Sequence, residues 1–170
     1  MKKASQLSLL ILIGGYLISC AVAPNTFHFI DYTNLIFHEA GHWLFMPFGE
    51  FMAFAGGSIN QVLIPLIVAG YFLGHKQIVS APLSLMWAGQ SLINVSVYAG
   101  DALKMQLPLL GGDNSIHDWN WMLIYLGQLR HTAGIANTIN ALGWICLFAG
   151  LLGGLYFILT ETENVNYVQD

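Results

Sequence analysis

The sequence predicts an all-α protein, a polytopic membrane helical bundle of about five spans. Of its 170 residues, 56% are hydrophobic and only 8% are charged, whereas a soluble domain carries roughly 25% charged residues. Several stretches without any charge are also long enough to cross a hydrocarbon core, which takes about 20 apolar residues. We therefore expect residues 1–170 to form a single integral membrane domain with membrane lipid over much of its surface.

The expected membrane-spanning helices follow one another closely along the chain. The charge-free segments are 5–23, 51–74, 77–100 and 132–160, and the segment 32–48 is apolar except around His38, Glu39 and His42. The apolar run 119–129 is too short to cross and is expected to be a re-entrant or half-span helix. Residues 161–170 are expected to form a short disordered tail.

The few basic residues predict an orientation. Lys2 and Lys3 favour a cytoplasmic N-terminus, and successive crossings then put Lys104 and Arg130 inside and Lys76 outside. The run 17–20 resembles the lipobox of a bacterial lipoprotein signal, although an uncleaved first span is preferred. We expect the cytoplasmic membrane of a bacterium, with the N-terminus inside. The basic residues form no stripe, so no nucleic-acid partner is expected.

A short motif in the segment 32–48 predicts metal chemistry. His38 and His42 are four residues apart, which on a helix puts both imidazoles on one face, where they can share Zn²⁺. Glu39 is rotated about 100° from His38, so it misses the metal and can act as general base towards a water. Ionisable groups inside a span cost about 2.5 kcal/mol or more each, and are rare unless paired, ligated or functional. The alternatives are a metal-free His-Glu-His hydrogen-bond cluster and, less well fitting, haem ligation.

The segment Asn34-Leu-Ile-Phe-His-Glu-Ala-Gly-His-Trp43 resembles the zinc-binding helix of the site-2 protease family of intramembrane metalloproteases. The resemblance implies a third ligand, an aspartate at the start of a later helix. Ile116-His117-Asp118-Trp119 stands where the family has a Leu-Asp-Gly motif, which makes Asp118 the ligand. It also implies that Asn94 helps to bind substrate, and that the run 56–60 corresponds to a glycine-rich region of the family.

Other residues compete with Asp118 for the third ligand position. Asp118 could instead cap the helix that it opens, and His117 is either a ligand or a neighbour of one. Asp101 is the reserve candidate, although it could be an interfacial charge, and Asp113 lies in a glycine-rich turn. We expect Asp118 to complete the site, with His117 and Asp101 as alternatives.

The expected function is that of an intramembrane zinc-dependent hydrolase, a metallopeptidase that cleaves a membrane-embedded peptide substrate. One alternative is a zinc amidase that acts on lipids, which needs the same metal and water. The other is a non-enzymatic membrane scaffold or transporter subunit, in which Glu39 has no catalytic role.

Overall fold

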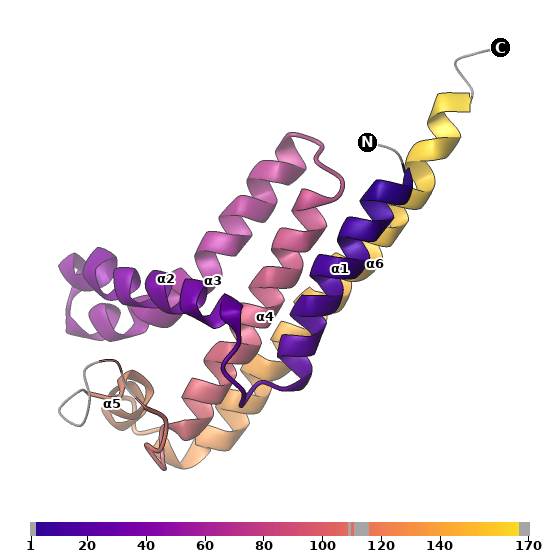
Figure 1. Ribbon diagram of the computed structural model, residues 1–170. Helices are drawn as coiled ribbons and strands as arrows, with labels where there is room; N and C mark the ends of the chain where they lie inside the picture. Colours follow the sequence, from indigo (N-terminus) through magenta and orange to yellow (C-terminus); the bar gives the residue numbers. More distant parts are fainter. Residues whose placement is uncertain (1–2, 109, 111–115, 167–170) are drawn as a thin grey trace.

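The computed structural model describes residues 3–108, 110 and 116–166, and it is helical without a strand over this part of the chain (Figure 1). The all-α prediction is thereby confirmed. The helices and 3₁₀ turns are α1 (Lys3–Val22), α2 (Phe29–Phe45), η1 (Met46–Phe48), α3 (Glu50–Gly74), α4 (Ser80–Asp101), α5 (Asp118–Tyr125), η3 (Leu129–His131) and α6 (Thr132–Asn166). α6 thus continues into the expected disordered tail, whose last residues, 167–170, lie outside the described chain. Asp113 lies outside it as well.

Within the described chain, three helical stretches are long and apolar enough to cross a membrane: α1, α3 and the stretch 129–160. The expected arrangement of about five spans is not confirmed. α4 has 22 residues and no charge before Asp101, but it carries two amides, four serines and a tyrosine, and it is less apolar than the three candidate spans. α2 has only 17 residues, among them Asp31 and Glu39.

α4 can be polar because it lies at the centre of the bundle, packed against α6, α3 and α1. Its apolar side meets α1 and α6 in a core of Leu10, Leu17, Met86, Ile93, Leu147 and Ile158. Glycines bring the backbones together here. A Cβ on Gly89 would lie 2.6 Å from the Leu147 nitrogen, and one on Gly143 would lie 2.8 Å from the Gly89 carbonyl oxygen. Small residues allow such close approach between apolar helices.

α2 runs crosswise to α1 and α6 and packs against α3 (Figure 1). As a result, the start of α1, the α3–α4 turn and the end of α6 lie at the same end of the bundle. The predicted orientation places Lys76, which follows α3, opposite the N-terminus, and the structure does not confirm this. The difference arises because α2 does not run along the bundle and therefore does not reverse the direction of the chain.

Candidate metal centre

The contact between α2 and α3 depends on glycine. A Cβ on Gly56 would lie 2.6 Å from the Gly41 carbonyl oxygen, and one on Gly57 would lie 2.6 Å from His38 Nε2. Real Cβ atoms do not come so close, so glycine is required at this crossing. The Asn60 amide then donates a 2.7 Å hydrogen bond to the Phe37 carbonyl, one residue before His38. The glycine-rich run 56–60 of α3 therefore fixes the position of α2, the helix that carries both histidines.

The position of α5 brings Asp118 to the same place. Trp119 Nε1 donates to Ser58 Oγ at 3.0 Å, and Trp121 stacks on Phe54 with 4.3 Å between ring centroids, so α5 is held on α3. The backbone N–H of Asp118 donates to the Tyr98 hydroxyl at 3.1 Å. His117, not Asp118, caps α5, because its side chain accepts from the Asn120 N–H. The alternative reading of Asp118 as a helix cap is therefore wrong.

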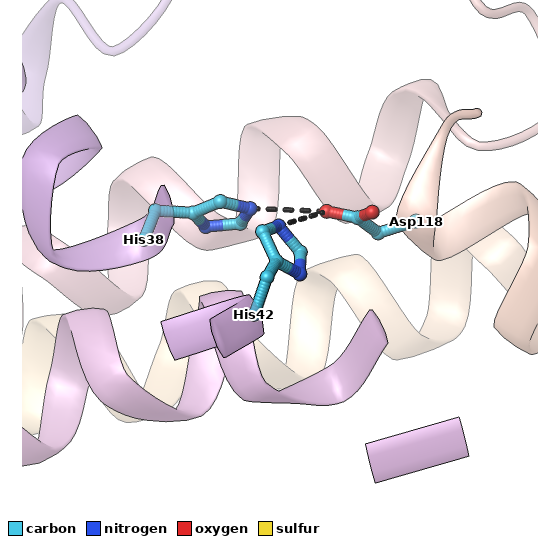
Figure 2. A group of neighbouring side chains, drawn as sticks. All are labelled: His38, His42 and Asp118. Carbon is cyan, nitrogen blue, oxygen red and sulfur yellow. Dashed lines mark hydrogen bonds and ion pairs between the residues drawn. The ribbon is translucent and has the colours of Figure 1, made fainter. Parts of the chain in front are cut away.

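His38, His42 and Asp118 converge on one point (Figure 2). Asp118 Oδ2 lies 3.0 Å from His38 Nε2 and 3.4 Å from His42 Nε2. All three potential ligand atoms lie within 4.8 Å of one another. The His38 and Asp118 side chains are 8% exposed and that of His42 is 23% exposed. The structure thus brings together the two histidines of the motif and the aspartate that the resemblance implied.

The other nitrogen of each imidazole already has an acceptor. His38 Nδ1 lies 3.1 Å from Gln61 Oε1, and His42 Nδ1 lies 2.8 Å from the Ala53 carbonyl oxygen. A carbonyl oxygen only accepts, so Nδ1 of each ring carries the proton. In the neutral ring Nε2 is then a lone pair, and both lone pairs face a carboxylate oxygen. Such a set is satisfied either by a further proton, which makes a ring an imidazolium that donates to Asp118, or by a metal cation between its members.

A zinc ion fits this donor set. Catalytic zinc sites use three protein ligands, for example three imidazoles or two imidazoles and a carboxylate, at Zn–N and Zn–O distances of roughly 2.0–2.2 Å. The edge of a tetrahedron with such bonds is about 3.3 Å long, close to the observed separations of 3.0 and 3.4 Å. Zinc-bound histidines also donate their second N–H to an acceptor, as both do here.

The charge state of Asp118 agrees with a role as ligand. Burial alone would raise the pKa of this carboxyl group. When the rings carry a proton on Nε2, hydrogen bonds from His38 and His42 outweigh that effect, so the pKa of Asp118 lies below its usual range. The carboxylate is therefore the stable form, as metal ligation requires.

His117 and Asp101, the alternative third ligands, lie outside the cluster of His38, His42 and Asp118 and face each other. His117 Nε2 lies 3.4 Å from Asp101 Oδ2 without making a hydrogen bond. Burial lowers the pKa of His117, so its ring is neutral, and Tyr98 packs against it at 4.4 Å. Asp101 also accepts from the backbone N–H groups of Gln106 and Leu107. Asp101 thereby holds the backbone at Gln106 and Leu107, just after α4.

Glu39 and Asn94 both face the cavity beside the cluster. The cavity has a volume of about 650 Å³, and its lining includes His38, His42 and Asp118. Glu39 is exposed to it, on the helix turn that carries His38. Asn94 is less free, because its carbonyl accepts from Gln61 and its amide donates to Asp31.

Gln61, Tyr98 and Asp31 also belong to the surroundings of the site, and the sequence did not single out Gln61 or Tyr98. Gln61 contacts a histidine, Tyr98 holds the backbone of Asp118, and Asp31 receives the amide of Asn94. One signal could have found Gln61: an amide inside an otherwise apolar span is costly and usually has a partner. The partner itself could not be named without the packing of α2 on α3.

Comparisons with protein-family models, with curated proteins and with solved structures found no match for this chain. The fold and the site therefore define its class: an all-helical protein with apolar helices of membrane-spanning length and a candidate His-His-Asp metal centre.

Proposed function

We propose that this protein is an intramembrane zinc-dependent hydrolase, a metallopeptidase of the site-2 protease kind that cleaves a membrane-embedded peptide. The observation that carries the proposal is the convergence of His38 Nε2, His42 Nε2 and Asp118 Oδ2 on one point beside a cavity that Glu39 also lines. Two nitrogen ligands and one oxygen suit zinc better than magnesium or calcium, which prefer oxygen alone.

The chemistry follows from the residues around the cluster. A zinc ion bound there would polarise a carbonyl group and lower the pKa of a water to about 7. Glu39 accepts a proton as the water oxygen bonds to the carbonyl carbon, and passes it to the amine nitrogen as the C–N bond breaks. His38 and His42 keep their Nδ1 protons throughout, because Gln61 and Ala53 hold them.

The lining of the cavity favours an apolar, uncharged segment as substrate. Most of its walls are aliphatic or aromatic, among them Leu35, Met46, Phe54 and Val97. Among the described residues that line the cavity there is no lysine or arginine, whereas Asp31, Glu39 and Asp118 are present. An anionic group bound there would have no side-chain counter-charge, and burying an unpaired charge is costly. An apolar peptide segment meets these conditions.

The proposed setting is the cytoplasmic membrane of a bacterium, with the N-terminus inside. Support comes from α1, α3 and the stretch 129–160, each long and apolar enough to cross, and from Lys2 and Lys3 at the N-terminus.

The test of the proposal is the substitution Glu39→Gln in detergent-purified protein. We expect cleavage of apolar helical peptides to fall by about 10²–10⁴-fold, the usual contribution of a general base, while zinc content stays at that of the wild type. Glu50→Gln is the matched control, because Glu50 is an exposed acid at the start of α3 that does not line the cavity.

Other results would point to other functions. Hydrolysis of lipid amides but not of peptides, lost equally with Glu39→Gln, would identify a zinc amidase. A wild type without bound zinc or hydrolytic activity would favour a membrane scaffold or transporter subunit.

A further inference from the structure

A line of buried amides leads away from the candidate metal centre. Gln61 Oε1 faces His38 Nδ1 at 3.1 Å, and Gln61 Nε2 donates to Asn94 Oδ1 at 2.8 Å. Asn94 Nδ2 in turn donates to Asp31 Oδ1 at 3.2 Å. The line begins on α2, passes through α3 and α4, and returns to α2 about two helical turns before His38.

The carboxylate at its end determines the direction of every hydrogen bond in the line. An ionised carboxylate only accepts, so Asn94 must turn its NH₂ group towards Asp31 and its oxygen towards Gln61. Gln61 must then donate to Asn94 and present its own oxygen to His38. That oxygen requires a proton on His38 Nδ1, which leaves Nε2 as the lone pair that faces Asp118.

We propose that Asp31 is a positioning residue for the metal centre: through Asn94 and Gln61 it holds His38 in the tautomer whose Nε2 can bind metal. The inference rests on the proposed metal-dependent function. In the usual carboxylate–histidine–metal arrangement the carboxylate contacts the histidine directly. Here two amides lie between them, so Asp31 acts on His38 without touching the ring.

The surroundings of Asp31 agree with this role. Its side chain is buried, and at the start of α2 its Oδ2 accepts from the His28 N–H at 2.7 Å. That contact belongs to the helix start and leaves Oδ1 for Asn94 and for Gln90, which donates at 3.0 Å. Helix capping therefore accounts for only one of the two carboxylate oxygens.

The experiment measures Zn²⁺ and Co²⁺ affinity of the full chain in detergent, by competition with a chelator, together with the visible spectrum of bound Co²⁺. Gln61→Met removes the acceptor from His38. We expect a loss of about 10–100-fold in affinity, as is usual when the partner of a metal-bound histidine is removed, and a changed Co²⁺ spectrum. Asp31→Asn is expected to act in the same direction, because an asparagine can either donate or accept and no longer sets the direction.

The matched control is Gln90→Met. Gln90 and Gln61 are equally buried amides, each 3% exposed. Gln90 also donates to Asp31 Oδ1, but it orients neither Asn94 nor Gln61, so the direction of the hydrogen bonds to His38 does not depend on it. We expect Gln90→Met to destabilise the fold as Gln61→Met does and to keep wild-type metal affinity.

Moving the carboxylate separates positioning from a structural role. In the double variant Asp31→Asn with Gln61→Glu, a carboxylate accepts directly from His38 Nδ1, and the number of acidic groups is unchanged. We expect metal affinity and the Co²⁺ spectrum to return to near wild type, although residue 31 is still asparagine.

Each failure has its own signature. Wild-type protein that binds no metal would overturn the proposed function. Wild-type protein that binds zinc, with Asp31→Asn and Gln61→Met unchanged in affinity, would overturn only the role of Asp31. Equal losses in Gln90→Met and Gln61→Met, or no recovery in the double variant, would also overturn it, since the network would then be purely structural.

Discussion

The two sides of α4 pack against their neighbours through different kinds of contact. The side towards α1 and α6 is closed by glycine contacts and by apolar side chains such as Met86 and Ile93. The side towards α2 and α3 is closed by directed hydrogen bonds, in which Gln90 and Asn94 reach Asp31 and Asn94 also accepts from Gln61. Apolar packing specifies distance, whereas hydrogen bonds also specify which atom faces which. Only the second kind of contact can set the protonation pattern of a metal ligand.

The largest expected effect comes from removing a proposed metal ligand on the side of α4 that faces α2 and α3. Both His38→Ala and Asp118→Ala should reduce the metal content from about one zinc per chain to none, because a site with a missing ligand does not hold the ion. Elemental analysis of purified protein measures this. Asp101→Ala serves as the control and should keep its zinc. Zinc retained in Asp118→Ala and lost in Asp101→Ala would move the third ligand to the end of α4.

A matched pair of glycine substitutions tests the comparison directly. The added methyl in Gly57→Ala would meet His38 Nε2, and that in Gly89→Ala would meet the backbone of α6 at Leu147. Each should lower the free energy of unfolding by about 1–3 kcal/mol, as overpacking usually does. Chelator competition should show weaker zinc binding for Gly57→Ala alone. Equal zinc affinity in both variants would mean that the two sides of α4 do not differ in this way.

A smaller effect is expected from Ser58→Ala, which removes the acceptor of Trp119 Nε1 and so loosens α5 on α3. Thermal unfolding in detergent should show a loss of about 1 kcal/mol. The control is Ser84→Ala, whose hydroxyl donates only to the Ser80 carbonyl of its own helix. That variant should stay within about 0.5 kcal/mol of the wild type.

The smallest effect should be that of Gly15→Ala on α1. A Cβ at Gly15 meets nothing within 4 Å, and alanine favours a helix by up to about 1 kcal/mol over glycine. We expect no loss of thermal stability and unchanged zinc affinity. A clear destabilisation would show that the face of α1 at Gly15 makes a contact outside the chain described here.

Part of this architecture could be read from the sequence because it depends on local spacing. The interval between His38 and His42 predicts a shared helical face, and low charge predicts apolar helices. The number of spans is harder to predict, because a stretch without charge need not be apolar enough to span a membrane. Within the stretch that became α4, Gln90 and Asn94 carry no charge and yet are too polar to face lipid, so counting charges missed them.

The remaining features depend on how distant segments pack. The spacing of residues within α2 does not indicate that this helix runs crosswise to α1 and α6. Its direction determines which helix ends lie at the same end of the bundle. The glycine crossing at Gly41 and Gly56 is visible only when both helices are in place. The partner of Gln61 likewise follows from the rotation of α3 against α2.

The polarity of α4 has a consequence for biosynthesis. In a bilayer, a lone helix with unpaired amides at Gln90 and Asn94 would be a poor candidate for insertion. α3 is long and apolar enough to cross a membrane, although it carries Asn60 and Gln61, and only residues 75–79 separate its end from the start of α4. The two helices would therefore leave the translocon as one hairpin, with α4 sheltered by α3 until α6 has been synthesised. Lengthening this short turn would be expected to delay membrane integration before it affected the finished protein.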